Sequence, residues 1–299
     1  MIKRWHIYLK EMYPVIPRLF LGIILFGVIY FFVLAKVSVA SFSFGMEEVT
    51  GVLTIFFFLL CLRIADEFKD FELDSKLFKE RPLPSGRVTK NDLKILAGIS
   101  IAIMIILNVI FTRNLIPFIV LAIYGILMSV WFFAKKYIQP NLLLALITHN
   151  PVQVILNFYI ISIVCNKYQL ELFTLSNVLI ACILYLPALG WEMGRKIKAP
   201  QNENEYVTYS KIFGYKRATI IVFCVFLLQA ILIAIAIYDI TSIYTIIGFA
   251  LALFIYLFVT IKFIQNPTND KINPKKVVPI YIYVVQIMLI GVILANYIW

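Results

Sequence analysis

Long apolar runs alternate with short charged or Pro- and Asn-containing segments along the whole chain. Several runs reach the roughly 20 residues that an α-helix needs to cross a hydrocarbon core. No low-complexity tract or linker interrupts them, so residues 1–299 are expected to form a single domain. The pattern predicts an all-α, polytopic membrane protein of about nine transmembrane helices, over residues 16–36, 48–66, 94–112, 115–134, 141–164, 174–192, 218–238, 242–263 and 278–298.

Composition and charge support this interpretation. Hydrophobic residues make up 62% of the chain, whereas a soluble domain has about 45–50%. Of the 27 Lys and Arg residues, 24 lie in the N-terminal segment or in and directly beside every second connection, leaving Lys36, Arg113 and Lys167 on the other side. The positive-inside rule then predicts a cytoplasmic N-terminus and an outside C-terminus. The net charge of +11 follows from topology, so the expected partner is the lipid bilayer and not nucleic acid.

Four carboxylates follow the second predicted span. No Gly or Pro occurs before Pro82, so the helix is expected to continue beyond the apolar core. At 100° per residue, Asp66, Glu67, Asp70 and Asp74 fall within about 100° of one face. Like charges so placed repel one another and favour a bound cation, for which Mg²⁺ is the natural candidate. The alternative is a solvated helix end, where interleaved lysines form ordinary surface ion pairs.

This stretch resembles the first aspartate-rich motif of the UbiA superfamily of intramembrane prenyltransferases, an Asn-Asp pair followed by two Asp at spacings of three and four. Asp66 stands in the Asn place, and Glu67, Asp70 and Asp74 follow. The next segment, residues 81–87 (RPLPSGR), matches the family almost letter for letter. The resemblance implies nine helices around a central cavity, with a diphosphate held by Mg²⁺ at its cytoplasmic mouth.

The family's second motif, two Asp four residues apart, is altered here. Glu192 stands for the first Asp, but Lys196 occupies the second place. Residues 206–214, which include Tyr209, resemble the family's stretch before its seventh helix, so the register holds. Because Glu192, Arg195 and Lys196 share one helix face, a direct cationic grip on the diphosphate could replace a second metal ion. Alternatively, Glu192 and Lys196 form a structural salt bridge.

A polar stripe interrupts the fifth predicted span. Asn150, Gln153 and Asn157 recur at i, i+3 and i+7, and His149 is adjacent. Polar groups at membrane depth face a bundle interior, where they either bind a polar substrate group or form hydrogen bonds between helices.

The resemblance implies Mg²⁺-dependent transfer of a prenyl group from an isoprenyl diphosphate to a lipophilic acceptor, either aromatic or lipid. A terpene cyclase on the same scaffold and a non-catalytic prenyl-lipid binder remain alternatives. The candidate catalytic residues, which are also the candidate metal ligands, are Asp66, Glu67, Asp70, Asp74 and Glu192. The candidate substrate-binding residues are Arg63, Lys79, Arg81, Asn150, Gln153, Asn157, Arg195, Lys196 and Tyr209.

Overall fold

The computed structural model describes residues 1–37, 42–239 and 241–298. Within these residues the chain forms α-helices and three short 3₁₀ turns. The first helices are α1 (Ile2–Met12), α2 (Val15–Lys36), α3 (Met46–Lys69), α4 (Phe71–Leu77), α5 (Lys90–Phe111), α6 (Leu115–Ser129), α7 (Lys135–Ile138) and α8 (Leu142–His149). The later ones are α9 (Val152–Tyr168), α10 (Leu175–Ile183), α11 (Leu186–Gly194), α12 (Tyr209–Phe213), α13 (Tyr215–Ile237), α14 (Ile243–Gln265) and α15 (Pro274–Ile298). The 3₁₀ turns are η1 (Trp131–Phe133), η2 (Pro200–Asn202) and η3 (Asp270–Ile272).

The predicted spans coincide with the apolar helices. In the described part of the chain, eight helical segments are long and apolar enough to cross a membrane. The remaining predicted span corresponds to α6, an apolar helix of 15 residues. The prediction of an all-α, polytopic membrane protein is therefore confirmed.

Two predicted spans differ from the observed helices in continuity. Residues 141–164 were expected to form one helix, but α8 ends at His149 and α9 begins at Val152. Pro151 causes this break, since it lacks an N–H and its ring clashes with the preceding turn. Residues 174–192 were also expected to form one helix, but α10 ends at Ile183 and α11 begins at Leu186. Pro187 lies in the first turn of α11.

The fourth span ends earlier than predicted, at Ser129. The next residues, Trp131, Phe132 and Phe133, have φ values of 56°, 50° and 58°. A left-handed turn of non-glycine residues costs about 1–2 kcal/mol per residue, so it needs support from its surroundings. Lys69 of α3 provides it, because its Nζ donates to the Met128 carbonyl at 3.3 Å and lies 4.6 Å from the Trp131 ring centroid.

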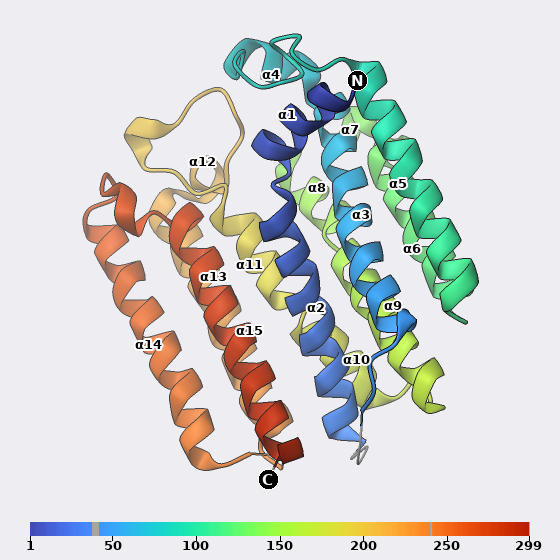
Figure 1. Ribbon diagram of the computed structural model, residues 1–299. Helices are drawn as coiled ribbons and strands as arrows, with labels where there is room; N and C mark the ends of the chain where they lie inside the picture. The colour runs from blue at the N-terminus through green and yellow to red at the C-terminus, as the bar shows by residue number, and fades with distance from the viewer. Residues whose placement is uncertain (38–41, 240, 299) are drawn as a thin grey trace. The chain divides into compact units, whose positions relative to one another are not determined.

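The chain divides into two compact units, to which α2 and α9 both contribute. Unit 1 comprises residues 1–27, 43–135 and 162–170, and unit 2 comprises residues 28–42, 136–161 and 171–299. In unit 1, α3 packs along α5 and also against α6 (Figure 1). Asn108 of α5 donates to the Thr54 hydroxyl of α3 at 2.9 Å, a buried polar contact at membrane depth.

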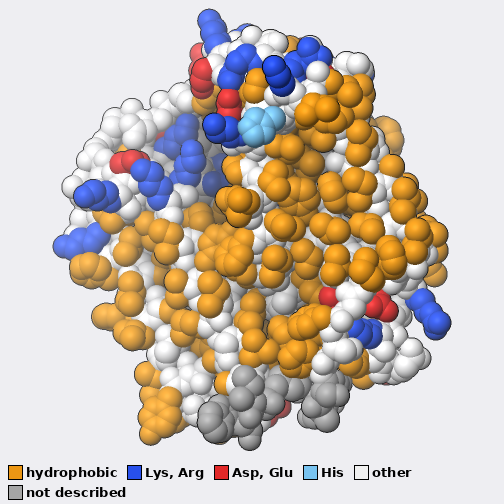
Figure 2. Space-filling model, in the orientation of Figure 1, with side chains coloured by type: hydrophobic (Ala, Val, Ile, Leu, Met, Phe, Trp, Pro, Cys, Tyr) orange, Lys and Arg blue, Asp and Glu red, His pale blue; other side chains and the backbone are white. Residues whose placement is uncertain are grey.

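The outer surface of unit 1 is apolar. Figure 2 shows hydrophobic side chains covering the part of the visible face that α5 forms. Since water would not solvate this surface favourably, it is suited to contact with lipid tails. Its exposed side chains include Ile106, Val109 and Ile110 of α5 and Ile116, Ile123 and Ile126 of α6.

In unit 2, α11 packs closely against α13 and α15. A Cβ atom added at Gly190 would lie 2.5 Å from the Phe226 ring, and one at Gly194 would lie 2.8 Å from Val278. Glycine at both positions therefore permits the approach of the helices. The contact fixes the end of α11, where the second motif begins.

Candidate functional site

The first acidic cluster lies where α3 passes into α4 and consists of Asp66, Glu67, Asp70 and Asp74. Asp70 stands between the two helices, with φ −101° and ψ 4°. Its N–H donates to the Asp66 carbonyl at 2.9 Å, and its carbonyl accepts from the Asp74 N–H at 2.8 Å. The acidic residues thus continue the helix beyond the apolar core, as predicted, although the helix bends at Asp70.

Two carboxylates of this cluster are buried and paired with arginines. Glu67 is 2% exposed and forms an ion pair with Arg63, one turn earlier on α3. Asp74 is 4% exposed, and one of its oxygens lies 2.6 Å from Nη1 of Arg81. A buried charge is tolerated only with such partners, so the arginines are part of the cluster's structure.

The other two carboxylates lie closer to water. The side chain of Asp66 is 48% exposed and lies 3.2 Å from Nζ of Lys69. Asp70 is partly exposed. The cluster therefore contains a buried pair and a partly exposed pair, a division that the helix angles alone do not predict.

The cluster is not arranged as a preformed metal cage. Among the described residues, no group of three or more Asp, Glu, His or Cys side chains is placed to hold a metal ion. Mg²⁺ commonly needs only one or two carboxylates, with substrate phosphates and water as its other ligands. The donor oxygens present fit that pattern, and the Mg²⁺ site remains a prediction.

The segment after α4 forms a compact turn that positions Arg81. Leu83 and Val88 are buried in the core between α1, α3 and α5. Gly86 has a φ of 75°, a backbone conformation that side chains disfavour, and the Ser85 N–H donates to the Arg81 carbonyl at 2.9 Å. The resulting turn fixes the backbone of Arg81, while Lys79 just before it is exposed.

Two residues beside the first acidic cluster were not identified as candidates from the sequence. Lys69, one of the lysines interleaved with the carboxylates, has a side chain only 9% exposed. Tyr8 of α1 is fully buried, and burial raises the pKa of its hydroxyl, with the negative charge of Glu67 adding to the shift. No sequence signal links Tyr8 to Glu67, because their proximity depends on how α1 packs against α3.

In unit 2, the second motif consists of Glu192, Arg195 and Lys196, which lie at the end of α11 and directly after it. One oxygen of Glu192 accepts from Nε of Arg195 at 2.7 Å, and the other lies 2.9 Å from Nζ of Lys196. The guanidinium of Arg195 also lies 5.0 Å from the Trp191 ring centroid. A single carboxylate thus holds two cations, leaving the motif with a net positive charge.

Tyr209 belongs to the same group. Its N–H donates to the Lys196 carbonyl at 3.1 Å, so α12 is fastened to the end of the motif. The hydroxyl is buried and has no hydrogen-bond partner among the described residues. Burial raises its pKa, and the negative charge of Glu192 contributes. From the sequence, Tyr209 was a candidate only because residues 206–214 resemble the family's stretch before its seventh helix.

The predicted polar stripe is divided by the break at Pro151. Asn150 donates to the Tyr185 hydroxyl at 3.1 Å, and Gln153 donates to Asn157 at 2.9 Å. Asn157 in turn donates to the Ala181 carbonyl at 2.9 Å, which ties α9 to α10. These bonds hold unit 2 together, and a role in substrate binding stays a prediction for all three amides.

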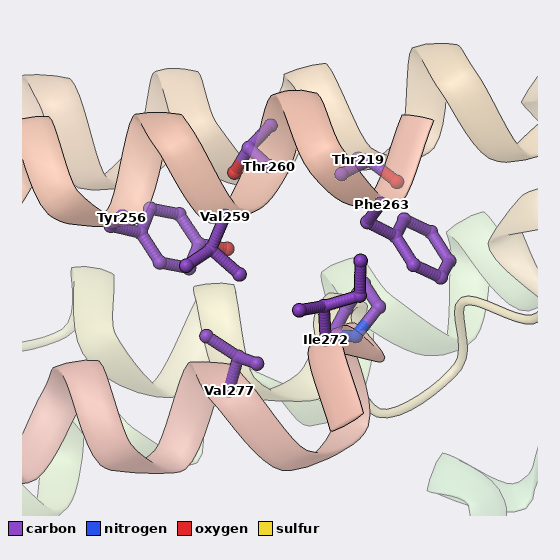
Figure 3. Close-up of a pocket in the computed structure, with 8 residues that line it drawn as sticks. Thr219, Tyr256, Val259, Thr260, Phe263, Ile272 and Val277 are labelled. Carbon is purple, nitrogen blue, oxygen red and sulfur yellow. The ribbon is translucent and has the colours of Figure 1, made fainter. Parts of the chain in front are cut away.

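A small pocket in unit 2 lies away from these charged groups. Figure 3 shows it between α13, α14 and the start of α15, with Tyr256, Val259 and Val277 among its lining side chains. Its lining is otherwise Thr, Phe, Ile and Pro. Such a lining offers no cation for a diphosphate, so this pocket is not the candidate site.

Comparisons with known proteins agree with the resemblance in the sequence. The model of the UbiA prenyltransferase family matches residues 24–285. A solved structure from a study of digeranylgeranylglyceryl phosphate synthase in membranes aligns with a TM-score of 0.64, covering 97% of this chain and 99% of that one, at 16% identity. At this identity the likeness shows a shared fold only. A search of curated protein sequences gives no match.

The pairing of Arg81 with Asp74 predicts a specific loss of stability. Arg81→Ala leaves a buried carboxylate without its partner, which should lower the free energy of unfolding by about 1–3 kcal/mol. The measurement is thermal unfolding of the purified protein in detergent.

Arg87→Ala is the matched control for this experiment. It also removes an arginine from the turn, but the ion pair of Arg87 with Glu11 is exposed on both sides, at 42% and 40%. The control should therefore unfold close to the wild-type temperature. Equal losses in the two variants would contradict a structural role for the buried pair.

Proposed function

Because the chain belongs to the UbiA prenyltransferase family, we propose that it transfers a prenyl group from an isoprenyl diphosphate to an aromatic or lipid acceptor within the membrane. The family match over residues 24–285, which includes both acidic motifs, carries this proposal. The apolar outer helices support it as well, since both substrates would dissolve in lipid. The similar solved structure comes from a study of a synthase that is named for a lipid phosphate, and this is compatible with a lipid acceptor.

The first acidic cluster is proposed to hold the diphosphate through Mg²⁺. Asp70 and Asp74 are the preferred ligands, with Glu67 and Asp66 next. Mg²⁺ bound there would neutralise the charge that develops on the leaving diphosphate. The cluster's position at the end of a membrane-spanning helix supports this role, because ionisable groups there usually line a functional site.

Arg63 and Arg81 are proposed to bind phosphate oxygens. Each is now paired with a buried carboxylate, so each is already held beside the cluster. When that carboxylate binds a cation, the guanidinium can donate hydrogen bonds to the diphosphate instead. The exchange keeps every buried charge paired. Lys79, exposed in the same segment, would add positive charge.

The altered second motif is proposed to contact phosphate directly. Arg195 and Lys196 share the single carboxylate of Glu192, so their combined charge is only partly neutralised. Where the family has a second Asp, this chain has the ammonium group of Lys196. The negative charge of Glu192 also acts on the buried hydroxyl of Tyr209, so Tyr209 is proposed to belong to the same phosphate-binding group.

We also propose that the N-terminus is cytoplasmic and the C-terminus outside. The support is the distribution of Lys and Arg, of which all but three fall in the N-terminal segment or in and directly beside alternate connections. Both motifs then belong to connections on the cytoplasmic side.

Removal of the two preferred ligands tests the cluster. Asp70→Asn combined with Asp74→Asn keeps side-chain size and removes two negative charges, so Mg²⁺-dependent release of diphosphate from a prenyl diphosphate should fall at least 100-fold, to background. The release is measured in detergent with a membrane-lipid extract as the source of acceptor.

Glu72→Ala is the control, because Glu72 is an exposed carboxylate of α4 outside the cluster. It should keep wild-type activity. Full activity in the folded double variant would overturn the assignment of the metal ligands.

Lys196→Asp tests the second motif by restoring the family's acid. If Lys196 grips phosphate, the substitution should lower kcat/KM for the prenyl diphosphate at least tenfold through charge repulsion. Lys198→Asp makes the same charge change two residues away, where the side chain contacts Asn204, and should have a much smaller effect. A large gain in activity for Lys196→Asp would argue against a direct grip on phosphate.

A further inference from the structure

Tyr8 covers the face of α3 that leads to the first acidic cluster. It belongs to a buried core with Leu60 and Ile64 of α3. Leu60, Ile64 and Glu67 are spaced by four and three residues, so they lie on one face of the helix. All three are at most 2% exposed. Tyr8 therefore packs against the face of α3 that carries Glu67.

The hydroxyl of Tyr8 has no hydrogen-bond partner in the part of the chain that the structure describes. Burial of such a group is unfavourable, which calls for a partner in some state of the protein. Burial raises the pKa of this hydroxyl, and the negative charges of Glu67 and Asp66 add to the shift while Arg63 opposes it. Tyr13, in the same core, differs because its hydroxyl donates to the Phe56 carbonyl at 2.7 Å.

The Glu67 carboxylate explains what the hydroxyl can do. In the structure this carboxylate is paired with Arg63. If Glu67 turns to a cation and Arg63 turns to phosphate, the buried carboxylate loses a hydrogen-bond donor. A neutral phenol can replace that donor. Unlike a guanidinium, it carries no positive charge that would repel the cation. Carboxylates that bind metals are usually oriented by such neighbouring donors.

We propose that Tyr8 is a positioning residue of the first acidic cluster, whose hydroxyl donates a hydrogen bond to the Glu67 carboxylate when Glu67 binds a divalent cation. The inference rests on the proposed function, because it takes the cluster as the cation site. It assigns a role in this site to α1, which lies outside both acidic motifs.

Tyr8→Phe tests the proposal, because it removes the hydroxyl and keeps the ring. Mn²⁺ binding to the purified protein is titrated by electron paramagnetic resonance with inorganic diphosphate present, and thermal unfolding is recorded without metal. Tyr8→Phe should bind Mn²⁺ about 10- to 100-fold more weakly. Its unfolding temperature should not fall, since the hydroxyl lost had no partner. Binding as tight as in wild type would overturn the proposal.

Tyr13→Phe is the matched control, because it removes the hydroxyl of the other tyrosine in the same core. It should unfold at a lower temperature than wild type, because its hydrogen bond is lost, and bind Mn²⁺ with unchanged affinity. Equal weakening of Mn²⁺ binding in both variants would also overturn the proposal, since it would indicate a general effect of the core.

The double variant of Asp70 and Asp74 separates this inference from the proposed function. If wild type binds Mn²⁺, the double variant does not, and Tyr8→Phe binds normally, only the role of Tyr8 fails. If the double variant binds as wild type does, or wild type binds no Mn²⁺, the cation site itself fails and the role of Tyr8 with it.

Discussion

A charge at the end of a membrane-spanning helix must be paired, and this constraint shapes both motifs. Glu67 and Asp74 are nearly inaccessible to water, so each is held by an arginine. Glu192, in unit 2, holds two cations in the same way. Without these partners, desolvation would disfavour the charged forms that a cation site requires. The ion pairs therefore offset the cost of burying the carboxylates and keep cations beside them.

The same pairing explains local features of unit 1 that would otherwise be unfavourable. The left-handed turn at Trp131, Phe132 and Phe133 is fastened by Lys69, which also pairs with Asp66. The turn that carries Arg81 is anchored by Leu83 in the core. Thus α3, α4 and the end of α6 meet around one set of charges.

The sequence predicted the fold well because hydrophobic runs of membrane length are a strong signal. It predicted less about where these runs break. The break at Pro151 has a visible cause, but the chain gives no comparable signal for the left-handed residues after Ser129 or for the bend at Asp70. The sequence also placed the four carboxylates of the first cluster together. The burial that separates Glu67 and Asp74 from Asp66 depends on neighbouring helices, and so does the position of Tyr8.

The most direct test of the account is diphosphate release from geranylgeranyl diphosphate by the purified protein, with and without Mg²⁺ and with and without a membrane-lipid extract. Organic products are identified by mass spectrometry. Prenyl transfer predicts release only when Mg²⁺ and extract are both present, with a product whose mass equals an acceptor plus one prenyl group. Release without extract, accompanied by a hydrocarbon product, would contradict the account and indicate a cyclase.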